Sequence, residues 1–280
     1  MDTRRVGILR AGRASLVDPG APVFSAFDLA PTRGDGVFET LLVRDGQVRK
    51  PAAHLERMAR SAALMGLQLP APGDWRRLIE ALVAEPMDSE AVLKLMLSRP
   101  GEGEAPTAVG TLSALGEEVL TQRRNGIAVV SLSSGLSASA RTGAPWLLGG
   151  VKSLSYAVNM AAQRHARSLG ADDAVFVSSD GMLLEGPTST VVWATGGVLH
   201  TPPLDLGVLA GTTQAALFAA AGEAGLGTAV RVGNVADLHA SDGSWLVSSV
   251  RGAAEIIRLD GAPRAPSALT STVQQLTGIT

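Results

Sequence analysis

A lysine and a glutamate stand out in this sequence because of the residues that surround each of them. Lys152 lies in the stretch Gly-Val-Lys-Ser-Leu-Ser-Tyr at 150–156, and Glu185 lies in Leu-Glu-Gly-Pro-Thr-Ser at 184–189. We expect Lys152 at the start of a helix and Glu185 at the end of a strand. A lysine amine can bond covalently to an aldehyde, and a carboxylate stabilises a protonated ring nitrogen. The two residues are therefore candidates for holding a cofactor that carries both an aldehyde and a ring nitrogen.

Further motifs lie on both sides of these two residues. Arg-Gly-Asp-Gly-Val-Phe-Glu-Thr occupies 33–40 and His-Leu-Glu-Arg occupies 54–57. Leu-Ala-Gly-Thr-Thr follows at 209–213 and Val-Ser-Ser at 247–249. With the stretches around the lysine and the glutamate, these motifs stand in the order seen in the fold-type IV pyridoxal-phosphate enzymes, and the chain resembles that family over nearly its whole length. The family includes branched-chain and D-amino-acid aminotransferases and aminodeoxychorismate lyase.

The resemblance implies a set of residues for pyridoxal 5'-phosphate. Lys152 is expected to hold the cofactor covalently, and Glu185 to pair with its pyridine nitrogen. Arg57 lies where the family has its phosphate-binding arginine. Hydroxyls and N–H groups at a helix start also suit a phosphate, and the expected residues of this kind are Thr212, Thr213, Ser248 and Ser249.

Three other residues are candidates for contacts with cofactor or substrate. Tyr156 stands four residues after Lys152, a spacing that places both on one side of a helix. It is expected to hydrogen-bond the cofactor's phenolic oxygen or to contact substrate, and plain packing is the alternative. By resemblance, Arg99 receives a substrate carboxylate, which suits a guanidinium, whereas an exposed arginine at a strand end is the other interpretation. Phe38 is expected to contact the substrate.

The same motifs bear on which reaction the chain performs. No tyrosine stands five residues after Lys152, which resembles the lyase and D-amino-acid branches more than the branched-chain one. The sequence of 38–40 also resembles the lyase pattern. We therefore predict a 4-amino-4-deoxychorismate lyase, which eliminates pyruvate to give 4-aminobenzoate for folate synthesis. The alternatives are an aminotransferase of the D-amino-acid or branched-chain type and a cofactor-free binding protein. The chain departs from the family at Ser155 and Thr190, where asparagine is usual, and at Gln214, where arginine is common.

Composition excludes several other classes of protein. With 280 residues, 46% hydrophobic and 18% charged, the chain is expected to be globular with a substantial core. A net charge of −2 provides no general attraction to nucleic acid or to anionic membranes. Cysteine is absent, and the four histidines show no metal-ligand spacing. The sequence has neither a signal-peptide core nor an apolar run long enough for a membrane span. We expect a cytoplasmic enzyme without a metal, and by resemblance a homodimer that acts on a small-molecule amine.

The order of apolar periods and turns predicts an α+β fold with two domains. We expect a smaller α/β domain at 1–115, a polar linker at 116–125 and a larger, β-barrel-like domain with the cofactor lysine at 126–280. The resemblance implies the arrangement of the D-amino-acid aminotransferases. Helices are expected at 51–66, 74–84, 153–169 and 211–224. Strands are expected at 6–9, 37–43, 91–98, 127–132, 174–177, 183–185, 190–194, 229–232, 245–247 and 254–259.

Overall fold

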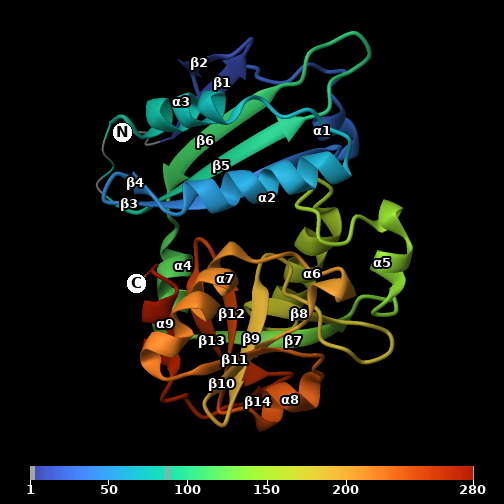
Figure 1. Ribbon diagram of the computed structural model, residues 1–280, viewed down its shortest axis with the longest axis vertical. Coiled ribbons are helices and arrows are strands. Elements are labelled where there is room, and N and C mark those ends of the chain that lie inside the picture. Colours follow the sequence, from blue (N-terminus) through green and yellow to red (C-terminus); the bar gives the residue numbers. More distant parts are fainter. Residues whose placement is uncertain (1–3, 86, 88, 280) are drawn as a thin grey trace. The chain divides into compact units, whose positions relative to one another are not determined.

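The computed structural model describes residues 4–85, 87 and 89–279, which form two compact units (Figure 1). The first unit contains the chain up to Gly116 together with Val151–Tyr156. The second contains Glu117–Gly150 and the residues from Ala157 onward. Each unit has its own sheet with helices packed on it, so the α+β class predicted from the sequence is confirmed.

The first unit is built on a six-stranded sheet in the order β2-β1-β6-β5-β3-β4. Every neighbouring pair in it is antiparallel. The strands are β1 (Arg5–Arg10), β2 (Arg13–Val17), β3 (Gly36–Arg44), β4 (Gln47–Val48), β5 (Ala91–Ser98) and β6 (Ala108–Ala114). The helices are α1 (Leu29–Arg33), α2 (Pro51–Leu64) and α3 (Pro72–Val83).

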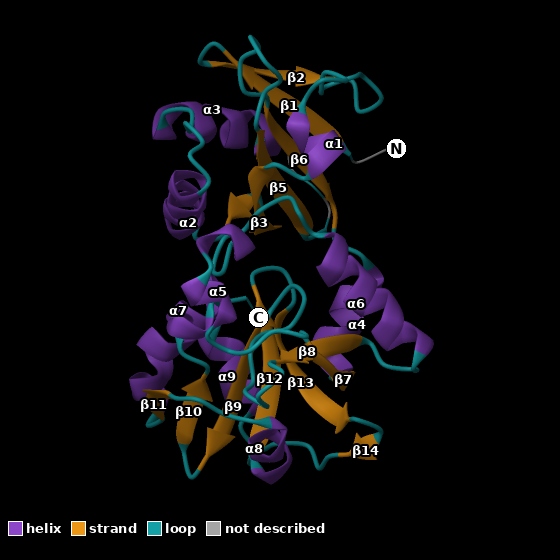
Figure 2. Cartoon of the chain, turned by 90° about the vertical axis from the view of Figure 1, so that its right-hand side faces the viewer, coloured by secondary structure: helices purple, strands orange, loops and turns teal. Residues whose placement is uncertain are grey.

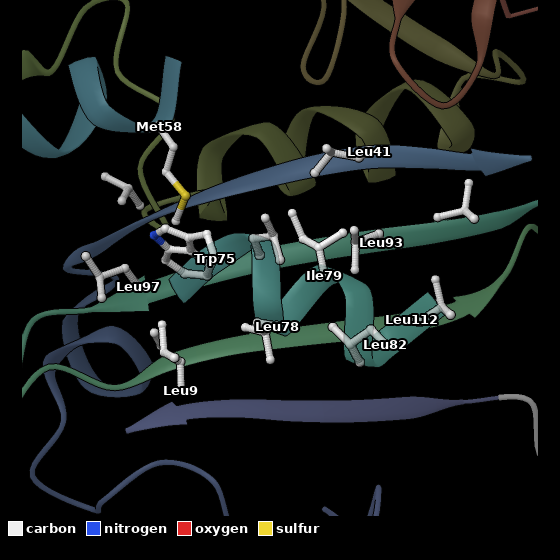
Figure 3. Packing of buried hydrophobic residues seen from close by; sticks show 14 of the residues in the cluster. Leu9, Leu41, Met58, Trp75, Leu78, Ile79, Leu82, Leu93, Leu97 and Leu112 are labelled. Atoms are coloured by element: carbon white, nitrogen blue, oxygen red, sulfur yellow. The ribbon is translucent and has the colours of Figure 1, made fainter. Parts of the chain in front are cut away.

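Helices α2 and α3 cover one face of this sheet (Figure 2). Along α3 the apolar residues recur at helical spacing, so that Trp75, Leu78, Ile79 and Leu82 all point toward the strands (Figure 3). On β5 every second residue from Ala91 to Leu97 is fully buried against them. Each fully buried leucine of this kind contributes roughly 1.5–3 kcal/mol through the hydrophobic effect.

Two glycines of the sheet allow α3 to approach closely. A Cβ atom at Gly7 on β1 would lie 2.7 Å from Leu78 Cδ1, and one at Gly110 on β6 would lie 2.5 Å from Leu82 Cδ1. Both distances are well below van der Waals contact. Glycine at these positions therefore leaves the space that the two leucines fill.

The second unit is built on a mixed sheet in the order β11-β10-β9-β12-β13-β7-β8, with β14 paired to β13. Strands β9, β10, β12 and β13 pair antiparallel, whereas β11, β7 and β8 join through parallel pairs. The strands are β7 (Ile127–Ser133), β8 (Asp173–Val177), β9 (Thr190–Thr195), β10 (Val198–Thr201), β11 (Gly227–Val230), β12 (Gly243–Ser248), β13 (Gly252–Leu259) and β14 (Ala262–Pro263). The helices are α4 (Glu117–Asn125), α5 (Ala140–Gly143), α6 (Ala157–Ser168), α7 (Thr212–Ala220), α8 (Val235–Ala240) and α9 (Thr270–Leu276). Short 3-10 turns lie at η1 (Pro145–Leu147), η2 (Leu204–Leu206) and η3 (Ala221–Ala224).

Both faces of this sheet are buried. Trp193 and Leu246 belong to a core that includes Leu238 of α8. Their chain neighbours Val192 and Trp245 belong to a second core, on the opposite face, with residues of α7 and α9. Nearly continuous apolar strands such as β9 are typical of sheets covered on both sides.

The structure differs from the sequence prediction at several segments, two of which are 116–125 and 183–185. Residues 116–125, predicted to be a linker, contain helix α4, and its charged residues account for the polarity of the segment. Its acidic residues lie in the first turn and its basic residues in the last, where each complements the helix dipole. The predicted strand at 183–185 is not a regular strand: Leu183 forms an isolated bridge with Val177. Beyond it, the Leu184 N–H donates to the Phe176 carbonyl over 3.0 Å and the Glu185 carbonyl accepts from the Phe176 N–H over 2.8 Å.

Within the described part of the chain, no helix has both the length and the apolar character that crossing a membrane requires.

Candidate active site

Lys152 lies in an extended segment that pairs with the edge of β3 in the first unit. The Phe38 N–H donates to the Lys152 carbonyl over 3.1 Å, and the Leu154 N–H donates to the Gly36 carbonyl over 2.8 Å. Between them Val37 and Ser153 form an antiparallel bridge. The helix predicted to begin at 153 begins instead at Ala157, so the expectation that Lys152 opens a helix is wrong.

This pairing places the Lys152 side chain beside two aromatic rings. Lys152 is only 8% exposed, and its Nζ lies 4.5 Å from the centroid of the Phe38 ring and 5.6 Å from that of Tyr156. The two rings meet edge to face with centroids 5.0 Å apart. The Lys152 backbone N–H donates to Ser61 Oγ on α2 over 3.1 Å. The structure thus brings together three predicted residues, although Tyr156 reaches Lys152 through an extended segment and not along a helix.

Arg57, the predicted phosphate arginine, belongs to a buried charge cluster that the sequence analysis did not identify. Its Nε and Nη2 donate to the two carboxylate oxygens of Glu39 on β3, each over 2.7 Å. The Nδ1 of His54 lies 2.7 Å from the same carboxylate. Glu39 is fully buried. The sequence does contain a signal for the buried role of Glu39, because this carboxylate alternates with Val37 and Leu41 on the apolar face of β3.

The charge states of this cluster follow from burial and pairing. Burial raises the pKa of Glu39, but hydrogen bonds from Arg57 and His54 outweigh it and lower the pKa to about 2. Glu39 is therefore ionised, and His54 Nδ1 carries the hydrogen that it donates. Burial lowers the pKa of His54, against the hydrogen bond to Glu39, which raises it. Neutral His54 and ionised Glu39 together fix the orientation of the Arg57 guanidinium.

Arg99, the predicted carboxylate receptor, lies at the end of β5. Its Nε donates to Asp35 Oδ2 over 2.7 Å, and its Nη2 donates to the Met65 carbonyl. The side chain remains 31% exposed. These contacts hold the guanidinium in one place while part of it stays accessible to solvent.

In the second unit, Glu185 follows the turn after β8. Its carbonyl accepts from the Phe176 N–H of β8 over 2.8 Å. Its carboxylate accepts from the Leu209 N–H over 3.1 Å and lies 3.7 Å from Arg141 Nη1. Sequence reasoning did not single out Arg141, because it stands in a Gly/Ser-rich segment far from Glu185 along the chain. The contacts tie the Glu185 carboxylate to the segment that leads into α7.

Three of the four predicted phosphate hydroxyls gather at the start of α7. The Thr212 and Thr213 hydroxyls lie 3.2 and 3.3 Å from Ser249 Oγ. Ser248, the fourth, ends β12, and its Oγ accepts from the Arg251 N–H over 3.3 Å. A Cβ atom at Gly211, just before the helix, would collide with Thr190 Oγ1. The backbone therefore comes close to β9 at the point where the first N–H groups of α7 lack helical partners.

The described residues thus offer the elements of a cofactor site in each unit. The first unit contributes a screened amine beside two rings and an arginine in a fixed orientation. The second contributes a carboxylate and a cluster of hydroxyls at a helix N-terminus, which attracts anions. Among the residues in view, no group of three or more histidines and carboxylates could hold a metal ion.

Comparison with known proteins places these features in a family. The family described as amino-transferase class IV matches residues 36–259. A Mycobacterium tuberculosis protein named bifunctional aminodeoxychorismate lyase / D-amino acid transaminase is 48% identical over 267 residues, covering 90% of this chain and 92% of the relative.

Solved structures agree with this assignment. A hypothetical aminotransferase from Mycobacterium tuberculosis, in its PLP-bound form, superimposes with a TM-score of 0.94 at 43% identity, covering 98% of this chain and 97% of that one. A hypothetical aminotransferase from Mycobacterium tuberculosis in its alpha-ketoglutarate and PMP bound form has a TM-score of 0.94 at 44% identity, with the same coverage. A fold IV-transaminase from Curtobacterium pusillum has a TM-score of 0.92 at 42% identity, covering 99% of this chain and 98% of that one. The fold-type IV architecture expected from the motifs is confirmed, and the chain belongs to the class IV aminotransferase family.

Proposed function

We propose that this chain is a pyridoxal-phosphate enzyme that eliminates pyruvate from 4-amino-4-deoxychorismate and leaves 4-aminobenzoate. The observation that carries the proposal is the buried Lys152, whose amine lies beside the rings of Phe38 and Tyr156. It stands in a chain 48% identical to a protein named for this lyase activity and for D-amino acid transamination.

The described residues fit the three functional groups of the cofactor. An aldehyde needs an amine screened from water, and Lys152 provides one. The ring nitrogen needs a carboxylate, and that of Glu185 is held by a backbone N–H. The phosphate needs hydroxyls and N–H groups, which Thr212, Thr213 and Ser249 provide at the start of α7. Pyridoxal phosphate is therefore the cofactor that these residues suit.

Each residue then has a defined task. When bound, pyridoxal phosphate supplies a ring that accepts electrons from the carbon bearing the substrate amine. The Nζ of Lys152 would be released when the substrate amine takes its place on the aldehyde, and would then accept the proton from that carbon as general base. The Glu185 carboxylate holds a proton at the ring nitrogen, because a negative charge stabilises the protonated form. Arg57, oriented by Glu39, is assigned to the phosphate. The Tyr156 hydroxyl is assigned to the cofactor's phenolic oxygen.

The lyase reaction places further demands on the substrate side. The substrate carries two carboxylates, and the accessible part of Arg99 is assigned to one of them. The ring of Phe38, next to Lys152 Nζ, is assigned to contact with the substrate ring. After Lys152 removes the proton, pyruvate leaves from the neighbouring ring carbon and the ring becomes aromatic. No oxidant is required, since the proton and the leaving group account for the new double bond.

Transamination of D-amino acids is the second candidate. It is supported by the double name of the Mycobacterium tuberculosis relative and by the aminotransferase solved with alpha-ketoglutarate. In that reaction Lys152 would deliver the proton that it has removed to a second carbon, and no pyruvate would be lost. The same residues serve both outcomes up to the first proton transfer.

Parallel assays of the purified chain distinguish the two. With 4-amino-4-deoxychorismate we expect 4-aminobenzoate and pyruvate in equal amounts. With D-alanine and alpha-ketoglutarate, formation of pyruvate and glutamate reports transamination. Activity in the assay with D-alanine and alpha-ketoglutarate, and none with 4-amino-4-deoxychorismate, would reject the lyase assignment in favour of the second candidate. A protein that shows neither activity and binds no pyridoxal phosphate would contradict both.

A further inference from the structure

A buried ion pair in the second unit joins several elements of the fold. Arg251 Nη2 lies 2.8 Å from Asp173 Oδ2, the first residue of β8, and both side chains are buried. The same nitrogen lies 3.4 Å from Ser189 Oγ, just before β9. Arg251 Nη1 donates to Gln122 Oε1 of α4 over 3.2 Å. One guanidinium therefore connects α4, β8 and the start of β9.

The carboxylate partner is itself held in place. Asp173 Oδ1 accepts from the Ala174 N–H over 2.9 Å and lies 3.4 Å from Gln163 Nε2 of α6. Removing charges from water is costly, so a buried pair of this kind persists only when hydrogen bonds satisfy both partners. A hydrogen-bonded polar network also favours one arrangement of the elements that it joins. Among the described residues, Arg251 Nε is buried and has no hydrogen-bond partner, so the network is held through the two terminal nitrogens of the guanidinium.

On one side, the network reaches the segment with the predicted phosphate residues. The Arg251 N–H donates to Ser248 Oγ over 3.3 Å. The next residue, Ser249, contacts the hydroxyls of Thr212 and Thr213. Anchoring Arg251 therefore anchors the turn that presents Ser249 to the start of α7.

On the other side, the network reaches the turn after Glu185. The Gly186 N–H donates to the Ser189 carbonyl over 2.8 Å, which closes that turn. A Cβ atom at Gly186 would collide with Ser189 Oγ, so a glycine there leaves the space that the hydroxyl occupies. Glu185 is also bound through its carbonyl to Phe176 of β8, the strand that begins with Asp173. Both connections fix Glu185 relative to the ion pair.

We propose that Arg251 is a positioning residue that sets the spacing between the ring-nitrogen subsite at Glu185 and the phosphate subsite at Ser249 and α7. The inference rests on the proposed cofactor roles of those residues. Pyridoxal phosphate is a rigid ligand that must satisfy both subsites at once, so its affinity depends on their separation. Arg251 contributes through Ser189 and Ser248 and needs no contact with the cofactor.

Arg251→Lys tests this by keeping the charge and removing the planar fork. An ammonium on a flexible stem cannot reproduce the simultaneous contacts to Asp173, Ser189 and Gln122. We expect the dissociation constant of pyridoxal phosphate to rise about tenfold. Pyridoxal and inorganic phosphate each occupy only one subsite, so their dissociation constants should change by less than about twofold. An unchanged constant for pyridoxal phosphate, or an equal loss for inorganic phosphate, would overturn the proposal.

Urea unfolding of the cofactor-free chain separates positioning from simple stabilisation. A residue that only stabilises the fold would lower the unfolding midpoint and leave all three dissociation constants of the folded protein unchanged. Arg231→Lys is the matched control, since Arg231 also forms an ion pair in the second unit, with Asp237 at 3.0 Å. It should leave the binding of pyridoxal phosphate as in the parent.

Ser189→Ala gives a second variant if Arg251→Lys does not fold. It removes one contact to Arg251 and leaves the ion pair intact, so no buried charge loses its partner. We expect the same selective weakening, about threefold for pyridoxal phosphate. If the parent binds the cofactor at Lys152 and both variants have the same dissociation constant for it as the parent, only the positioning role of Arg251 is overturned. Parent protein that does not bind the cofactor would instead contradict the proposed function.

Discussion

At the scale of single residues, the chemistry depends on Lys152, an amine buried beside two aromatic rings. Borohydride reduction of the protein with pyridoxal phosphate should fix the cofactor to Lys152, as peptide mass analysis can check. Lys152→Ala should abolish turnover and leave the unfolding midpoint nearly unchanged, because the ring contacts of the lysine are a small part of the core. The exposed Lys94 on β5 provides the control. An adduct there instead of at Lys152 would refute the site.

Arg99 governs the predicted affinity for an anionic substrate. A charge-assisted hydrogen bond contributes roughly 1.5–3 kcal/mol, or about tenfold to a hundredfold in binding. Arg99→Ala should therefore raise KM for 4-amino-4-deoxychorismate by that factor and leave the visible spectrum of the bound cofactor unchanged. Arg10→Ala, at the exposed end of β1, should have no such effect. If KM does not respond to the loss of Arg99, another cation receives the carboxylate.

The cluster of Glu39, His54 and Arg57 predicts how stability depends on pH. The unfolded chain protonates His54 as the pH falls below about 6.5, before the folded chain does, because burial lowers the pKa of His54 in the folded state. Glu39 adds a second loss between about pH 4.5 and pH 2, since its pKa falls from 4.5 to about 2 on folding. Both changes reduce stability as the pH falls. At about 1.4 kcal/mol per pH unit, the Glu39 contribution is on the order of 3 kcal/mol.

Urea unfolding at pH values from 7 down to about 3 tests this dependence. Glu39→Gln is destabilised at every pH, because Arg57 loses its buried partner. The informative quantity is the slope, which should become shallower below about pH 4.5 in the variant. Equal slopes in parent and variant would show that Glu39 does not titrate as its surroundings indicate.

At the scale of elements, the segment at 151–156 explains both the success and the failure of sequence reasoning. Strand β5 was predicted with its observed bounds, and α2 nearly so, because their apolar periods are local signals. The start of α6 was placed too early. Residues before Ala157 pair with β3, more than a hundred positions away, and no local pattern reports such a contact. Arg141 and Arg251 were missed for the same reason, since each acts through a partner distant in sequence, whereas Glu39 left a local signal in its position on the apolar face of β3.

Ser61 on α2 tests whether this segment must be held for Lys152 to work. Ser61→Ala removes the acceptor of the Lys152 N–H, and a buried donor left without a partner costs about 1–3 kcal/mol. We expect turnover to fall about tenfold or more. After the cofactor is removed by dialysis and added back, the cofactor-bound form should return more slowly than in the parent. Ser113→Ala on β6, half-buried in the same unit, is the control. Turnover equal to that of the parent would show that pairing with β3 alone holds Lys152.

At the scale of the whole molecule, the homodimer expected from the family remains a prediction, and the segment at 133–150 is where we expect the second subunit to make contact. Trp146 is 79% exposed there and its neighbour Leu147 is 38% exposed. Adjacent exposed apolar side chains of this size mark interaction surfaces more often than isolated ones do. The segment also contains Arg141, which lies beside Glu185. Contact at this segment would therefore couple assembly to the cofactor site.

Light scattering at assay concentration should find a dimer, and Trp146→Ser should shift it toward monomer as the concentration is lowered. Removing a large ring from an interface costs apolar burial at roughly 25 cal/mol per Å², enough to weaken a dimer tenfold or more. Turnover should fall in parallel, because the segment that touches Glu185 loses its support. Leu169→Ser removes an exposed apolar residue outside the segment and should leave both the mass and the turnover unchanged. A parent protein that is monomeric and fully active at the same concentration would refute the dimer, and the exposed Trp146 would then need an explanation within a single chain.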